Sequence, residues 1–210
     1  LEVFCDLYPG ADLFTLLHIP GSVSAVIERR TITTSFIQRL PQAHQRYRWY
    51  LPLFPAAVRA FDLSGYDLVL SSSHCVAKAV RARPGALHIC YCFTPMRYVW
   101  DRYGDYVGNR ASLPVRLLMP PAAAVLRAWD RRTSDRVHRF VAISRFIAER
   151  IPRCYGGSAD VIYPPVDVSR FRIPDDPAPD PSDGFYLVVS ALVPYKRVDL
   201  AVEAASRLGR

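Results

Sequence analysis

Short, continuous apolar runs that alternate with helical patterns are the feature that most constrains the fold of this chain. The runs with strand character are DLFTLLH (12–18), YDLVLSSS (66–73), LHICYCF (87–93), RFVAIS (139–144) and ADVIYPP (159–165). Strands that are apolar throughout, each followed by a helix, are typical of a parallel sheet covered on both faces. The chain is therefore predicted to be an α/β protein of the doubly wound type.

The segments between these runs have helical patterns. QRYRWYLPLFPAAVRAF (45–61) predicts a helical stretch interrupted by Pro52 and Pro55, and a basic helical region further on is expected to break at Pro120-Pro121. SRFIAERIPRCYG (144–156) predicts a helix that begins at a Ser144 cap and stops at Gly156.

The composition changes at PDDPAPDPSDG (174–184), which has the character of a linker. Beyond it, FYLVV (185–189) predicts a buried strand, and apolar residues from Val198 to Leu208 mark one face of a helix. We predict a first domain in 1–173, a linker in 174–184 and the start of a second α/β domain in 185–210. Because such a domain usually needs ~100–150 residues, the chain is expected to be an internal part of a longer protein.

The net charge, the apolar runs and the cysteines indicate which classes of protein the chain can belong to. The net charge is +8, and Lys78 and Lys196 are the only lysines, so the other basic residues are arginine. No apolar run approaches the ~20 residues that a membrane span needs. Cys90 and Cys92 would point to one face of a strand, but no second Cys/His pair completes a metal site. The five cysteines are expected to be buried free thiols of a cytoplasmic protein.

The stretch 110–139 is rich in arginine, and Asp130 and Asp135 are its only acidic residues. Three interpretations stay open: a solvated helix face, contact with an anionic membrane surface, or nucleic-acid binding. No groove-reading motif supports the last of these. The membrane hypothesis places this stretch on the inner face of the plasma membrane, next to a lipid-linked acceptor.

The loop in VVSALVPYKRVDLAVEAA (188–205) joins a predicted strand to a predicted helix and holds Lys196 and Arg197. In open parallel sheets, ligands bind at the carboxyl ends of strands, where helix N-termini face outward. An ammonium group beside the positive pole of a helix favours an anionic ligand. The loop is therefore a candidate phosphate site.

Five motifs in order resemble the family-four glycosyltransferases: SSSHCVAKAV (71–80), HICYCFTPMRYVWD (88–101), RFVAISRFIAERIPRCYG (139–156), DVIYPPVDVSRF (160–171) and VVSALVPYKRVDLAVEA (188–204). The chain looks most like the bacterial group that builds O-antigen and exopolysaccharide, some members of which transfer mannose. The resemblance implies the GT-B architecture of two Rossmann-like domains, of which the first binds the acceptor and the second the nucleotide sugar. It also implies transfer with retention, without metal or other cofactor.

The resemblance assigns roles to residues on the donor side. Lys196 matches the family lysine that meets the donor diphosphate, and Arg197 lies beside it. The family often has an arginine where this chain has Ala191. Diphosphate binding is therefore expected to depend on Lys196 and Arg197.

On the acceptor side, many relatives have a histidine at the position of Phe93, and His74 is the nearest replacement for it as a catalytic group. Arg97, Tyr98 and Trp100 are either acceptor contacts or the packing of an irregular loop. Ser144 and Arg145 are placed at the cleft, with Ile143 where relatives commonly show Asn. The segment from Tyr163 to Asp167 resembles the crossing between the two domains.

The resemblance implies a glycosyltransferase that moves a sugar from a nucleotide-diphosphate sugar to a glycan or lipid-linked acceptor. The alternative is a catalytically inactive relative that binds sugar nucleotides, which Phe93 and Ala191 favour. A basic nucleic-acid binder ranks third. Residues 1–210 alone are expected to transfer no sugar, because half of the proposed cleft is missing.

Overall fold

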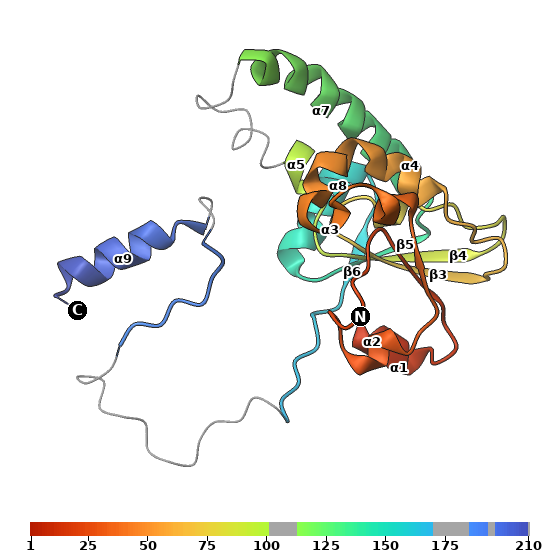
Figure 1. Ribbon diagram of the computed structural model, residues 1–210, viewed down its shortest axis with the longest axis horizontal. Coiled ribbons are helices and arrows are strands. Elements are labelled where there is room, and N and C mark those ends of the chain that lie inside the picture. The colour runs from red at the N-terminus through yellow and green to blue at the C-terminus, as the bar shows by residue number, and fades with distance from the viewer. Residues whose placement is uncertain (101–112, 170–184, 193–195, 210) are drawn as a thin grey trace. The chain divides into compact units, whose positions relative to one another are not determined.

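The computed structural model describes residues 1–100, 113–169, 185–192 and 196–209, and Figure 1 shows its ribbon. The chain divides into two compact units, Leu1–Pro164 and Pro165–Arg210. The predicted linker 174–184 and the predicted domain boundary at 173 lie outside the described residues, so that division of the chain stays a prediction.

A four-stranded parallel sheet organises the first unit. Its strands, in spatial order, are β3 (Leu68–Ser73), β4 (Leu87–Cys92), β5 (Arg139–Ala142) and β6 (Ala159–Val161). Each lies within one of the apolar runs named above, so the α/β class with parallel strands is confirmed. The first run yields β1 (Leu13–Thr15), which pairs in parallel with β2 (Ile32–Thr34) in a separate two-stranded sheet. The sequence did not predict β2, because ITT is short and two of its three residues are polar.

Helices connect these strands. Among the described residues of the first unit, the α-helices are α1 (Glu2–Leu7), α2 (Ala25–Glu28), α3 (Ala43–Arg46), α4 (Phe54–Arg59), α5 (Arg97–Trp100), α7 (Leu113–Ser134) and α8 (Arg145–Tyr155). The 3-10 helices are η1 (Phe36–Arg39), η2 (Tyr47–Leu53) and η3 (Ala77–Ala79). The interrupted helix predicted for 45–61 is confirmed as the succession α3, η2 and α4, with Pro52 inside η2.

The predicted break at Pro120-Pro121 is wrong, since α7 continues through both prolines. Proline keeps a helical φ, and its cost in a helix comes mainly from the missing N–H and from the ring's contact with the preceding turn. Both prolines are exposed, so water can reach the carbonyls that lose their donors.

Helices cover both faces of the four-stranded sheet. Cys90 and Cys92, which are fully buried, pack with Ile147 and Ile151 of α8. Tyr91 lies between them in sequence and points to the opposite face, where its ring meets that of Phe4 from α1 at 5.9 Å. Figure 1 shows α8 and α1 on opposite sides of the strands. All five cysteines are buried and free, as predicted.

His88 is a fully buried histidine at the start of β4. Its Nε2 lies 2.8 Å from Ser71 Oγ, and its Nδ1 lies 3.1 Å from the carbonyl oxygen of Arg136. A neutral ring satisfies both contacts, because Nδ1–H donates to the carbonyl while Nε2 accepts from the hydroxyl. Burial lowers the pKa of His88 to about 4.

This lowered pKa predicts a loss of stability in mild acid. The unfolded chain takes up the His88 proton near pH 6.5, whereas the folded chain resists it until about pH 4, so stability falls as the pH drops between these values. Between pH 7 and pH 5 the loss from this group should be about 2 kcal/mol. Urea unfolding of wild type and His88→Gln at both pH values measures it, since the other histidines are common to both proteins. An equal loss in the two proteins would contradict the assignment.

The second unit holds one regular element, α9 (Val198–Arg207), among its described residues. The helix predicted after Lys196 is confirmed, but the strand predicted for FYLVV is wrong: residues 185–192 have no strand structure and are exposed. A strand is stabilised by hydrogen bonds and side-chain packing with neighbouring strands. In the described part of this unit, no neighbouring strand is present to pair with it.

In the described parts of the chain, none of the helices combines the length and hydrophobicity that crossing a bilayer requires.

Candidate functional site

The carboxyl edge of the four-stranded sheet brings several predicted site residues together. The strand register aligns Ser73, Cys92, Ala142 and Val161 across the sheet. The ladder continues one residue further, through hydrogen bonds from Phe93 N to Ser73 O (2.8 Å) and from Ile143 N to Cys92 O (3.3 Å). The loops that begin at His74, Phe93 and Ile143 therefore leave the sheet side by side. In open parallel sheets, this edge is where ligands bind.

His74 is exposed and follows β3 directly. The residue that follows β4 at the same edge is Phe93, whose ring contacts the ring of Tyr91 at a centroid distance of 5.4 Å. Phe93 is 38% exposed and has no hydrogen-bonding group. Of these two neighbouring side chains, His74 is the one that can exchange a proton with a ligand at this edge. Its catalytic role remains a prediction.

Ser144 and Arg145 begin α8 at the same edge. Ser144 Oγ accepts a hydrogen bond from Ile147 N (3.3 Å), which makes Ser144 the N-cap that the sequence predicted. Arg145, the first residue of the helix, is exposed. An arginine beside the positive pole of an 11-residue helix favours an anionic group at this place.

Arg97 and Trp100 lie in α5, just after β4. Arg97 is exposed, whereas Trp100 is half-buried and packs against the hydrophobic cores on both sides of it. Trp100 Nε1 donates a hydrogen bond to Asp130 Oδ2 at 2.8 Å. Trp100 therefore has a packing role, and contact with an acceptor remains a prediction for Arg97 and Trp100. The side chain of Tyr98 lies outside the described residues.

A buried polar network, which we call the Lys78 network, anchors this region. Lys78 of η3 and Asp130 of α7 are 1% and 0% exposed, and Lys78 Nζ lies 2.8 Å from Asp130 Oδ1. Lys78 Nζ also donates to the Asp130 carbonyl (2.6 Å) and to Thr133 Oγ1 (3.1 Å). Asp130 Oδ2 accepts from Trp100 Nε1 and from the Tyr155 hydroxyl (3.0 Å). The network thus joins η3, α5, α7 and the end of α8.

Tyr155 contacts the charged groups of this network, and its pKa is shifted as a result of burial and charge. Its ring lies 4.6 Å from Lys78 Nζ, in cation–π contact. Burial raises the pKa of Tyr155, and the Asp130 carboxylate raises it further. Tyr155 therefore stays a hydrogen-bond donor at any physiological pH.

The sequence did not predict this network. One signal for it was present: in a chain whose basic residues are otherwise arginine, Lys78 is one of two lysines.

Of the arginines between 110 and 139, Arg127 and Arg136 are not on an open surface. Arg127 Nε donates to the Val99 carbonyl (2.5 Å) and Arg136 Nη1 to the Ala79 carbonyl (2.6 Å). Arg131, Arg132 and Arg139 are exposed. Arg110 lies outside the described residues, as does the side chain of Arg116.

Lys196 and Arg197 belong to the second unit and precede α9. Both side chains are exposed. Arg197 has a left-handed backbone (φ 48°), and its guanidinium contacts the Asp199 carboxylate at 2.9–3.0 Å. Asp199 raises the pKa of Arg197 and is itself held in the charged form. Arg197 is thus already paired with an acid of its own helix.

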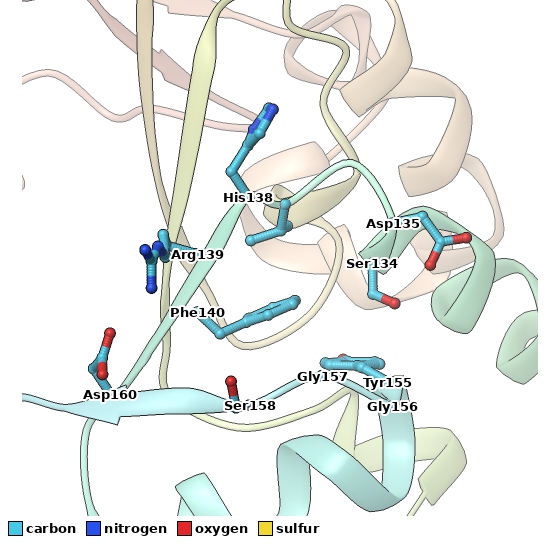
Figure 2. Close-up of a pocket in the computed structure, with 11 residues that line it drawn as sticks. Ser134, Asp135, His138, Arg139, Phe140, Tyr155, Gly156, Gly157, Ser158 and Asp160 are labelled. Atoms are coloured by element: carbon cyan, nitrogen blue, oxygen red, sulfur yellow. The ribbon is translucent and has the colours of Figure 1, made fainter.

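A cavity of about 470 Å³ lies at the opposite edge of the four-stranded sheet. Figure 2 shows its residues around the start of β5 and the turn before β6, among them Asp135, His138, Arg139, Gly157 and Asp160. The amino ends of the strands line this cavity, and none of the predicted site residues does. It is therefore separate from the candidate site. No group of three His, Cys, Asp or Glu side chains suited to a metal occurs in the described residues.

Comparison with known proteins gives one match. A family model described as Glycosyltransferase Family 4 matches residues 4–170. No curated protein and no solved structure matches the chain. The matched range contains β1–β6 and the loops at the carboxyl edge, and it ends before Lys196.

Proposed function

The chain belongs to glycosyltransferase family 4, and on this premise we propose that it moves a sugar from a nucleotide-diphosphate sugar to a glycan or lipid-linked acceptor. The observation that carries the proposal is the family match over 4–170, a range that includes the carboxyl edge of the four-stranded sheet with His74, Arg97 and Ser144. We further propose that the sugar is mannose and that the product is a cell-surface polysaccharide. The protein would work in the cytoplasm, peripherally bound to an anionic membrane.

The roles proposed for residues follow from where they lie. His74 and Arg97 would meet the acceptor and the reacting sugar at the carboxyl edge of the first unit, beside the capped start of α8. Lys196 would bind the donor diphosphate. Transfer with retention requires that charge on the leaving diphosphate be neutralised, and a cation with the positive pole of a helix supplies this stabilisation. We propose that Lys196 and α9 act in this way, without a metal ion.

Turnover tests the proposal directly. The protein as its gene encodes it should release nucleoside diphosphate from one member of a panel of nucleotide sugars, and release should depend on a glycan or lipid-diphosphate acceptor. Calorimetric titration with the same donors separates the alternative, because an inactive relative would bind a nucleotide sugar without acceptor-dependent release. Absence of both binding and release would refute the proposed function.

A further inference from the structure

An exposed surface of aromatic and arginine side chains lies on η1, α3 and η2. It consists of Phe36, Arg39, Arg46, Tyr47, Arg48, Trp49 and Leu53, which we call the 36–53 surface. Trp49 is 69% exposed, and Phe36, Tyr47 and Leu53 are each about 40% exposed. Single exposed apolar residues are ordinary, but here four large ones lie on η1 and η2, two short helices that contact each other, as is typical of a contact surface.

The segment that carries this surface is firmly packed on its inner side. Ile37, Ala43 and Phe54 are buried in or beside the hydrophobic core, and Tyr50 and Leu51 pack against that core. The Tyr50 hydroxyl donates to the Pro41 carbonyl at 2.7 Å. Trp49 is therefore presented outward by an anchored element, while its neighbour Tyr50 turns inward.

An arginine lies against each of two exposed rings, those of Trp49 and Tyr47. The Arg46 guanidinium carbon lies 4.4 Å from the centre of the Trp49 ring, and that of Arg48 lies 5.6 Å from the centre of the Tyr47 ring. From 29 to 61 the sequence contains no Asp or Glu, and its arginines are Arg29, Arg30, Arg39, Arg46, Arg48 and Arg59. A surface with this charge complements an anionic partner.

We propose that the 36–53 surface docks the protein onto anionic phospholipid. Trp and Tyr favour the boundary between headgroups and acyl chains, and arginines beside them bind lipid phosphates. Leu53 favours a bilayer over nucleic acid, because its side chain can enter the acyl region but neither stacks on bases nor forms hydrogen bonds with them. This proposal rests on the proposed function, which includes contact with an anionic membrane. It assigns that contact to the 36–53 surface instead of the stretch 110–139, where Arg127 and Arg136 donate hydrogen bonds to backbone carbonyls.

Vesicle binding tests the proposal without any sugar, so its outcome is independent of transferase activity. The whole chain should co-sediment with vesicles that contain phosphatidylglycerol and phosphatidylcholine at about 0.1 M salt, and poorly with phosphatidylcholine alone. Arg46→Ser/Arg48→Ser should weaken binding on the order of tenfold to thirtyfold, and Trp49→Ala should weaken it further. Arg46→Glu/Arg48→Glu, which keeps Trp49, should abolish binding. Thermal unfolding checks that each variant is folded, as expected for exposed side chains.

The matched control is a second exposed ring with an arginine over it. Phe146 of α8 is 65% exposed, and the Arg150 guanidinium carbon lies 5.5 Å from its ring centre, but Glu149 lies beside them in the same helix. Phe146→Ala/Arg150→Ser should leave vesicle binding unchanged. An equal loss in this control, or binding that ignores lipid charge, would overturn the proposal. Tighter binding to single-stranded RNA, lost in the same Arg46 and Arg48 variants, would assign the surface to nucleic acid instead.

Discussion

Replacing Asp130 with alanine should destabilise the first unit by about 3–5 kcal/mol, as expected when one partner of a buried ion pair is removed. The substitution leaves the Lys78 ammonium, 1% exposed, without its 2.8 Å counter-ion. It also leaves Trp100 Nε1 and the Tyr155 hydroxyl without the oxygen that accepts from both. Urea unfolding at pH 7, followed by circular dichroism, measures the change.

A surface ion pair provides the control for this prediction. Asp67 pairs with Arg83, and their side chains are 83% and 44% exposed. Asp67→Ala should cost no more than about 1 kcal/mol, because water screens an exposed pair. If Asp130→Ala costs as little as Asp67→Ala, the Lys78 network does not stabilise the fold.

The double substitution Lys78→Met/Asp130→Leu distinguishes the effect of the buried charges on stability from the effect of packing. With both charges removed, neither is left buried alone, so the double variant should be more stable than Asp130→Ala. It should still fail to recover wild-type stability in full, because Trp100 and Tyr155 remain without an acceptor.

The parallel sheet could be predicted because its signal is local. Each of the runs at 66–73, 87–93, 139–144 and 159–165 carries its own continuous apolar pattern, which is typical of strands in a parallel sheet. The carboxyl edge with His74, Phe93 and Ser144 follows from the parallel arrangement of these strands. The N-cap at Ser144 and the left-handed Gly156 are equally local signals, and both are found.

What the sequence could not show depends on residues far apart. Lys78 and Asp130 are separated by 52 positions, and the residues around them in the sequence do not predict that the two side chains meet in the core. In the sequence, Asp130 stands among arginines and fits a solvated helix face. The FYLVV run failed as a prediction for a related reason: its composition favours a strand, but a strand also needs a partner. At Pro120-Pro121 the prolines predict a break, whereas the pattern around them predicts a helix. The structure has a continuous helix through both prolines.

Lys196→Ala should lower kcat/KM for the nucleotide sugar by about tenfold to several hundredfold in the protein as its gene encodes it. A hydrogen bond to a charged group contributes roughly 1.5–3 kcal/mol, and charge that builds on the leaving diphosphate strengthens this one in the transition state. Lys196 lies just before α9, beside the positive pole of the helix.

Arg197→Ala is the matched control, because it removes the neighbouring cation. The Arg197 guanidinium is held by Asp199 through contacts of 2.9–3.0 Å, so its charge is already neutralised within the helix. Its loss should change kcat/KM by less than that of Lys196. Thermal unfolding of both variants should match wild type, since both side chains are exposed.

Lys196→Arg makes the prediction more specific. Ala191 supplies no second cation in this segment, so under the proposed function diphosphate binding should depend on the shape of the group at 196. A planar guanidinium does not reproduce the compact point charge of an ammonium group, and Lys196→Arg should therefore restore only part of the activity. If Lys196→Ala keeps the wild-type kcat/KM, or if Arg197→Ala loses more, the phosphate role proposed for Lys196 is wrong.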